Sequence, residues 1–179
     1  MTSGGLAIWS IGHSDHPFDA FVELLRRHDI EAVADIRTVP RSRRHPQFDT
    51  QALAASLPAA GIAYRHLPRL GGWRRTSPDS VNTAWRNASF RGYADHMLTE
   101  EFARGFAELE AMARASRTAM MCSEALWWRC HRSLVADHAV ARGIRVLHIG
   151  SDARVTEHVL SDIARVAEDG SVRYPGEPS

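Results

Sequence analysis

The sequence contains no lysine, so all 22 of its basic side chains are arginine. Its two cysteines, Cys122 and Cys130, are too few to suggest a disulfide framework. No uninterrupted apolar stretch approaches the length of a membrane span. The first residues also lack the basic segment and long apolar block of a secretory signal. These absences predict a protein of the reducing cytoplasm that has no membrane partner.

The composition is that of a folded globular protein. Hydrophobic residues make up 44% of the chain and charged residues 24%, which excludes wholesale disorder. The length of 179 residues suits one domain with a substantial core. We therefore expect a single domain over residues 1–179, with a core from about 6 to 168 and a loose C-terminal tail.

Short apolar runs alternate with amphipathic stretches through most of the chain. The apolar runs are typical of buried strands and lie at 6–12, 30–38, 62–68, 117–122 and 144–150. The amphipathic stretches predict helices at 18–29, 50–57, 90–98, 100–116, 131–143 and 152–169. This alternation predicts an α/β fold, a three-layer sandwich with a mostly parallel five-stranded sheet and helices on both faces.

Polar residues follow four of the five predicted strands, and ligands bind beyond the carboxyl ends of strands in folds of this kind. The first four strands are followed by Gly12, His13 and Ser14, by Asp35, Arg37 and Arg41, by Arg69, Gly71 and Gly72, and by Cys122, Ser123 and Glu124. Only the fifth strand, which ends near His148, is weak in reactive groups. Gly12 would let the backbone approach a ligand closely.

Asp35 and Arg37 are two residues apart on a predicted strand, so their side chains point to the same face. One interpretation places both of them in a catalytic or binding site. The alternative is an ion pair that organises the loop, which strand-end acids often form. The residues leave both interpretations open.

The stretch MMCSEALWWRCHR, residues 120–132, carries both cysteines. Cys122 closes an apolar strand near helix-terminal amides and two arginines, surroundings that would lower the pKa of a thiol. Glu124 and His131 would serve as proton carriers. Neighbouring residues in a helix do not face each other, so a couple between Cys130 and His131 is unfavourable. We therefore favour Cys122 as the reactive thiol.

Three alternatives exist for the same cysteines. Cys122, Cys130 and His131 would bind zinc or iron in a metalloprotein, although the spacing between the cysteines is not that of standard zinc sites. The two thiols would form a redox pair if the loop between them folds back, although the spacing is not C-x-x-C. In the third alternative, both cysteines have no chemical role and are small buried hydrophobic residues.

The segment from residue 36 to 91 is strongly basic. It holds ten arginines against two acids, a net charge of +8, and the guanidinium group suits phosphate and carboxylate oxygens. Four tryptophans lie in this segment or in the cysteine loop, namely Trp73, Trp85, Trp127 and Trp128. Arginine and aromatic side chains together bind nucleic-acid bases. The alternative is that the arginines pair with acids from elsewhere in the chain.

Five motifs, in this order along the chain, resemble one protein family. They are SIGHS at 10–14, DIRTVPRS at 35–42, LGG at 70–72, FRGYADHM at 90–97 and MCSEALWWRCHR at 121–132. Together they resemble the bacterial and archaeal family called Domain of Unknown Function 488, and the C-x-E-x5-C-H-R element is the specific part. The family has no settled activity, so the resemblance supports a fold and a site and names no reaction.

The resemblance marks a set of motif positions, namely His13, Asp35, Arg37, Ser42, Tyr93, Cys122, Glu124, Cys130, His131 and Arg132. A fainter similarity is to rhodanese and cysteine-phosphatase domains, which also place a cysteine between a strand and a helix. The chain departs from the phosphatase pattern because Trp128 stands where the arginine belongs and Arg129 comes one place later.

These observations predict a thiol-dependent transferase or hydrolase that acts on an anionic substrate, either a phosphate-bearing small molecule, a nucleotide or a nucleic acid. The expected catalytic residues are Cys122, Glu124, His131 and Asp35. The expected substrate-binding residues are His13, Arg37, Arg41, Tyr93, Arg129, Cys130 and Arg132. We expect no cofactor, zinc or iron being the alternative. A nucleic-acid-binding or processing module is the other function that fits the sequence.

Overall fold

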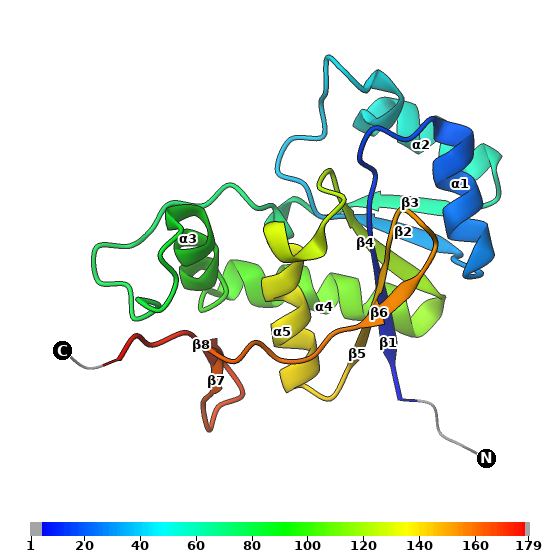
Figure 1. Cartoon of the computed structure of the whole chain (residues 1–179). Helices are drawn as coiled ribbons and strands as arrows, with labels where there is room; N and C mark the ends of the chain where they lie inside the picture. The colour runs from blue at the N-terminus through cyan, green and yellow to red at the C-terminus, as the bar shows by residue number, and fades with distance from the viewer. Residues whose placement is uncertain (1–4, 178–179) are drawn as a thin grey trace.

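A six-stranded sheet forms the centre of the molecule (Figure 1), whose computed structural model describes residues 5–177. The strands are β1 (Ala7–Gly12), β2 (Ala32–Asp35), β3 (Ala63–His66), β4 (Thr118–Cys122), β5 (Arg145–Ile149) and β6 (Val155–Glu157). They are arranged in the order β3-β2-β4-β1-β5-β6. The first five pair in parallel, and β6 pairs antiparallel with β5. The predicted α/β sandwich with a mostly parallel sheet is confirmed, with one edge strand added.

Helices cover both faces of this sheet. They are α1 (Phe18–Arg27), α2 (Thr50–Ala59), α3 (Ala88–His96), α4 (Glu100–Ala115) and α5 (Arg132–Ala141), with short 3-10 turns η1 (Pro46–Phe48), η2 (Pro68–Leu70) and η3 (Trp127–Arg129). Helices α1 and α2 lie on one side of the sheet, and α4 and α5 on the other (Figure 1). Within the part of the chain that is described, no helix has the length and apolar character needed to cross a bilayer.

Each face of the sheet has its own hydrophobic core because side chains alternate along a strand. In β1, Ile8 packs into the core under α4 and α5, whereas Trp9 and Ile11 pack into the core under α1 and α2. Helix α4 begins where Thr99 accepts a hydrogen bond from the backbone N–H of Phe102. This side-chain cap satisfies one of the amides that a helix start leaves without a partner.

The order of the strands creates a crevice at their carboxyl ends. The chain leaves β1 toward β2 on one side and leaves β4 toward β5 on the other, although β1 and β4 are neighbours. Such a reversal opens a space between the departing loops, and ligands bind there in open α/β sheets. In the register of the sheet, Gly12 lies beside Cys122, and Asp35 lies beside Met121. The fold therefore brings three strand ends with chemistry-bearing residues together.

The predicted helix at 152–169 is wrong. The segment forms the edge strand β6, followed by a small antiparallel pair of β7 (Arg165–Val166) and β8 (Val172–Arg173). The backbone of residues 155–157 forms hydrogen bonds with the open edge of β5 instead of forming a helix. Val159, which the amphipathic pattern assigned to the apolar face of a helix, is 80% exposed. A helix here would also have had to bury this valine.

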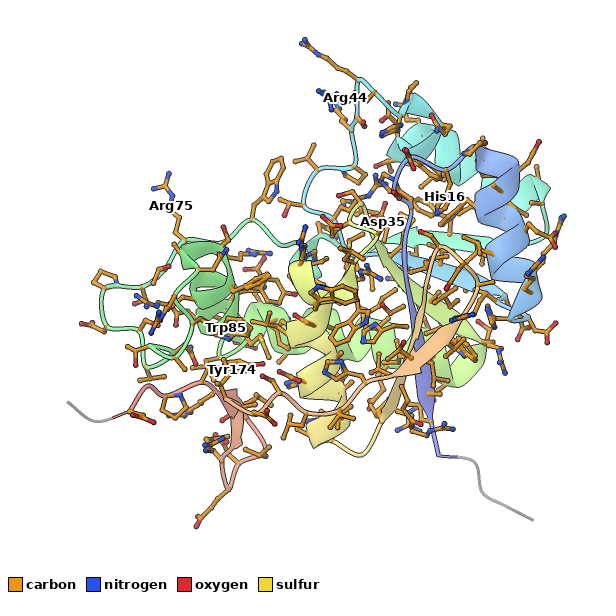
Figure 2. The ribbon with its side chains drawn as sticks, viewed as in Figure 1. His16, Asp35, Arg44, Arg75, Trp85 and Tyr174 are labelled. Carbon is orange, nitrogen blue, oxygen red and sulfur yellow. The ribbon has the colours of Figure 1, made fainter. Side chains whose placement is uncertain are left out.

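The expected loose tail is likewise wrong as far as Tyr174. The Tyr174 side chain is fully buried, and its hydroxyl donates a hydrogen bond of 2.7 Å to Asp137 Oδ2. Its backbone N–H donates to Asn82 Oδ1 at 2.9 Å. The ring lies 5.5 Å from that of Trp85, as the two labelled side chains show (Figure 2). The C-terminal segment is thus part of the core beside α3 and α5.

Replacing Tyr174 with Phe tests this anchoring. The variant keeps the ring but leaves a buried carboxylate oxygen without its donor, so we expect a loss of about 1–3 kcal/mol in the free energy of unfolding. Urea denaturation followed by far-ultraviolet circular dichroism measures it. Val159→Ala, at an exposed position, is the control and should change the stability by less than about 0.5 kcal/mol. Equal stability of the Tyr174→Phe variant and the wild type would contradict the anchoring.

Candidate active site

A cavity of about 630 Å³ opens at the carboxyl ends of β1, β2 and β4. Eight of the residues expected at a site line it, namely His13, Arg37, Arg41, Cys122, Glu124, Arg129, Cys130 and His131. Three others do not line it, namely Asp35, Tyr93 and Arg132. The cavity is large enough for a small-molecule ligand.

The two thiols lie in contact at the base of this cavity. Their Sγ atoms are 2.6 Å apart, and both cysteines are free and buried. Cys122 ends β4 and Cys130 lies two residues before the first residue of α5, while the turn η3 folds the loop between them back on itself. The condition set from the sequence for a redox pair, that this loop folds back, is therefore met.

Arg132 lies behind the thiols and is fully buried. Its Nε donates to Cys122 Sγ at 2.9 Å, its backbone N–H donates to Cys130 Sγ at 3.4 Å, and its Nη2 donates to the carbonyl oxygen of Glu124. Among residues 5–177, no carboxylate lies within 4.0 Å of its guanidinium. A buried positive charge requires an opposite charge nearby. The thiol pair, ionised once, is the group positioned to supply it.

The pKa values of the two thiols diverge for this reason. Burial raises the pKa of Cys130, but the hydrogen bond from Cys122 and the charge and N–H groups of Arg132 outweigh it and lower that pKa to about 7. Burial, together with the neighbouring Cys130, raises the pKa of Cys122 well above its usual value. These directions favour Cys130 as the thiol with the lowered pKa, whereas the sequence pointed to Cys122.

His131 contacts Cys130, which the sequence argument judged unfavourable. The reason is that neither residue lies inside the helix: Cys130 has an extended backbone, and His131 is the residue that precedes the first turn of α5. The Nε2–H of His131 donates to the carbonyl oxygen of Ile36 at 2.8 Å. Its unprotonated Nδ1 consequently faces Cys130 Sγ at 3.5 Å. Burial lowers the pKa of His131, so the imidazole is a neutral proton acceptor.

Asp35 and Arg37 form the ion pair that was the second interpretation of their spacing. Arg37 donates to both carboxylate oxygens of Asp35, at 2.8 and 2.6 Å, and the hydroxyl of Tyr64 donates to the same carboxylate. The Asp35 side chain is completely buried. This position fits a residue that orients Arg37. It does not fit the catalytic role that the sequence predicted for Asp35.

His13 lies between this ion pair and the cavity. Its Nε2 accepts a hydrogen bond from Arg37 Nη1 at 3.2 Å, and its Nδ1–H donates to the carbonyl oxygen of Ser14. Burial lowers the pKa of His13 to about 4, so the ring is neutral near pH 7. These bonds and those to Asp35 and Phe48 occupy four of the five N–H donors of Arg37, which leaves one for a ligand.

The rim of the cavity carries two arginines that have no acidic partner. Arg41 and Arg129 are exposed lining residues, and no carboxylate of residues 5–177 lies within 4.0 Å of either guanidinium. Glu124 is also exposed on the rim, where its carboxylate accepts a hydrogen bond from the backbone N–H of Leu126. The rim therefore offers two free cations to an anionic ligand.

Tyr93 supports the site from behind. It is fully buried, its hydroxyl donates to the carbonyl oxygen of Leu70 at 2.8 Å, and its ring centre lies 5.0 Å from that of His131. This position fits a residue that fixes the His131 ring and does not fit direct contact with a substrate. Arg132, also expected to bind substrate, acts instead on the thiols.

The contacts of the cysteines do not favour the metal alternative. Within residues 5–177, no group of three or more His, Cys, Asp or Glu side chains is arranged to hold a metal ion. A zinc or iron ion on Cys122 would lie against the guanidinium of Arg132, which repels a cation. His131, through its bond to Ile36, has one nitrogen already engaged.

A buried hydrogen-bonded chain leads away from Arg132, and sequence reasoning missed it. Arg132 Nη1 donates to Ser10 Oγ at 2.8 Å, and Ser10 Oγ lies 2.8 Å from His148 Nδ1. His148 Nε2 lies 3.0 Å from His158 Nδ1, and His158 Nε2 lies 2.8 Å from Asp137 Oδ1. Each group donates to the next, so the chain ends on a carboxylate.

The environment keeps His148 in this chain neutral. Burial lowers the pKa of His148 to about 2, and the ring of Trp127 stacks on it at 4.3 Å. Ser10 is in register with His148 in the sheet, but they are 138 residues apart. The signal available in the sequence was a serine and a histidine in two apolar strands, and only strand pairing shows that they are neighbours.

The fold and the site define an α/β protein with a pair of buried thiols beside an arginine at its strand ends. The chain belongs to the family described as Domain of unknown function DUF488, whose model matches residues 17–139. The matched region includes β2, β4 and the loop with both cysteines, and it ends before β5. Neither a curated protein nor a solved structure matches the chain.

Replacing Ser10 with Ala tests the link between the buried chain and the thiols. The change removes the acceptor of Arg132 Nη1, so more of the buried positive charge is left for the thiols to offset. We expect the pKa of Cys130 to fall by about half a pH unit to one pH unit, since one hydrogen bond contributes about 0.5–1.5 kcal/mol. The pH dependence of iodoacetamide alkylation measures it. Ser123→Ala, at an exposed position on the same cavity, is the matched control. An identical pH profile for both variants would disprove the link.

Proposed function

We propose that this protein is a cysteine-dependent transferase or hydrolase that acts on an anionic, phosphate-bearing substrate. The observation that carries the proposal is the contact of Cys130 with both the Nδ1 atom of His131 and the backbone N–H of Arg132, at the base of a cavity with free arginines. A nucleophile, a base and a group that orients the base are the parts that covalent catalysis requires.

The distances suggest an order of proton transfers. Cys130 gives its proton to Nδ1 of His131, and the Ile36 carbonyl stabilises the imidazolium through Nε2–H. The Cys130 thiolate attacks the electrophilic atom of the substrate, and His131 returns the proton to the leaving group. Water or a second substrate then takes the transferred group from sulfur. Cys122 keeps its proton throughout and donates a hydrogen bond to the thiolate.

Free arginines are the reason for choosing an anionic substrate. Four of the ten arginines between residues 36 and 91 form ion pairs, namely Arg37, Arg65, Arg69 and Arg74. The other six have no carboxylate within 4.0 Å among residues 5–177, namely Arg41, Arg43, Arg44, Arg75, Arg86 and Arg91. Figure 2 shows Arg44 and Arg75 projecting outward from the molecule. Internal pairing therefore neutralises only part of the basic segment.

Alkylation of single-cysteine variants tests which thiol is the nucleophile. Because only the thiolate reacts, alkylation of the wild type should rise with pH through about 7. Cys122→Ser should remain reactive. Cys130→Ser should react more slowly at pH 7, since burial, the largest cause of the raised pKa of Cys122, remains in this variant. The reverse ranking would return the role to Cys122.

The same reaction reports on the substrate class. Inorganic phosphate, nucleotides and sugar phosphates are added separately, and at least one should protect Cys130 from alkylation. The protection should be lost in the Arg41→Ala, Arg129→Ala double variant. The Arg104→Ala, Arg114→Ala variant is the control, because both residues lie on α4 outside the cavity. The absence of protection by every phosphate compound would refute an anionic phosphate substrate.

A compound that protects Cys130 should be turned over by the wild type and not by Cys130→Ser. A compound that protects but is never turned over would refute the proposed enzyme activity.

A nucleic-acid ligand is the second candidate, and one observation favours it. Trp73 lines the cavity and is 75% exposed, and Trp128 beside Arg129 is 54% exposed. Exposed aromatic rings next to free arginines form the stacking surfaces that bind single strands. Such a ligand would place its phosphates on the exposed arginines and a base on Trp73.

Fluorescence anisotropy with short single-stranded DNA and RNA tests this candidate. Binding should weaken steeply between about 50 and 200 mM salt, as counterion release requires. Trp73→Ala should reduce the affinity by roughly 5- to 100-fold, the effect of losing one stacked base. Val81→Ala, at an exposed apolar position, is the control. Negligible binding at low salt, or binding that salt does not change, would exclude this candidate.

A further inference from the structure

The second thiol exceeds what nucleophilic catalysis needs. A cysteine with a histidine base suffices for that chemistry, yet Cys122 Sγ lies 2.6 Å from Cys130 Sγ. We propose that Cys122 and Cys130 form a redox-active dithiol that exchanges two electrons reversibly with a low-molecular-weight disulfide bearing carboxylates, excess disulfide driving the oxidation of the protein. The proposal goes beyond the phosphate chemistry above and does not depend on it.

The two sulfur atoms are positioned for a bond. A disulfide requires about 2.05 Å between them, so the atoms need to approach by only about half an ångström from their distance of 2.6 Å. Both residues flank the same loop, Cys122 at the end of β4 and Cys130 after the turn η3. A loop that already folds back allows the bond to form with little change in the backbone.

Arg132 makes the reduced form the favoured one. The ionised dithiol neutralises its buried guanidinium, which has no carboxylate within 4.0 Å among residues 5–177. A disulfide is neutral and would leave that charge unpaired. A dithiol whose reduced form is stabilised in this way gives an oxidising disulfide that is easily reduced. The bond would therefore be a reactive intermediate and not a structural crosslink.

The cavity determines which oxidant reaches the pair. Both cysteines line the cavity and are otherwise buried, so a large protein disulfide cannot approach them. Arg41 and Arg129 stand free on the rim of the same cavity. Guanidinium groups bind carboxylates through paired hydrogen bonds. A small disulfide with carboxylate groups fits both the size and the charge of the site.

The reaction proceeds by two exchanges. The Cys130 thiolate attacks one sulfur of the small disulfide, forms a mixed disulfide with it and expels the other half as a thiolate. Cys122 loses its proton to His131 and attacks Cys130 Sγ, which forms the Cys122–Cys130 bond and expels the second half as a thiolate. Two electrons pass from the protein to the substrate, which leaves as two thiols after protonation.

Mass spectrometry after acid quenching and alkylation counts the free thiols, with oxidised glutathione as the probe. The wild type should lose both free thiols to an internal disulfide, which dithiothreitol reverses. Cys122→Ser should stop at one glutathione adduct on Cys130, and Cys130→Ser should form its adduct more slowly at pH 7, because its remaining thiol is buried. A wild type that stops at the adduct, or keeps two free thiols, would overturn the proposal. Faster formation of the adduct on Cys122 in the Cys130→Ser variant than on Cys130 in the Cys122→Ser variant would overturn the assignment of Cys130 as the first thiol.

A cationic disulfide, cystamine, tests the preference for carboxylates. The Arg41→Ala, Arg129→Ala variant should react with oxidised glutathione about tenfold more slowly, while its reaction with cystamine should be unchanged or faster. The Arg104→Ala, Arg114→Ala variant should match the wild type with both. Equal slowing with both disulfides would refute the carboxylate preference. Thiol counting requires no phosphate substrate, so failure of the phosphate experiments leaves this result intact, and the reverse also holds.

The role of Arg132 is tested by the redox equilibrium with glutathione. Arg132→Met should favour the protein disulfide by at least about tenfold in the equilibrium constant, equivalent to about 30 mV. If that variant does not fold, Ser10→Ala supplies the measurement, with an expected change of about two- to tenfold in the opposite direction, toward the dithiol, because the arginine then depends more on the ionised thiols. An equilibrium constant unchanged from the wild type, in whichever of these variants folds, would refute the stabilisation of the dithiol by arginine.

Discussion

The positive charge of Arg132 is buried beneath the site, and the surrounding structure is organised to accommodate it. The guanidinium is fully buried and contacts a thiol, a hydroxyl and a carbonyl oxygen. An isolated charge in such surroundings would cost several kcal/mol in lost hydration. Negative charge on the cysteine pair offsets that cost, so the same interaction that stabilises the fold here also activates sulfur.

Backbone approach around this arginine depends on two glycines of the predicted motifs. A Cβ atom at Gly12 would collide with the backbone carbonyl of Glu124, the same carbonyl that accepts from Arg132. The close approach that the sequence suggested for Gly12 is therefore with the chain itself and not with a ligand. A Cβ at Gly72 would lie 2.6 Å from Nδ1 of His131. A side chain at either position would therefore push the Glu124 carbonyl or the His131 ring away from its place beside the thiols.

Electrostatics separates the inside of the cavity from its rim. Inside, Arg37 and Arg132 are committed to protein partners, Asp35 and the thiols respectively. On the rim, Arg41 and Arg129 are free for a ligand. The buried charges set the state of the nucleophile, and the exposed ones select what reaches it. This division explains how one site offers both thiol chemistry and anion binding.

The sequence alone was enough to predict the alternation of strands and helices as far as β5, the edge of the sheet that holds the site, and eight of the residues that line the cavity. These follow from local periodicity and from the rule that parallel strands bring their carboxyl ends together. For residues close together in the chain, such as Asp35 and Arg37, the sequence also predicted an ion pair as one of two interpretations. Tertiary structure alone decided the contacts of the two thiols, because the fold places His131 Nδ1 beside Cys130 and the guanidinium of Arg132 beside Cys122. It also decided that Ser10 lies beside His148 and that residues 155–157 form a strand. Both depend on pairing between strands, which a local sequence pattern does not predict.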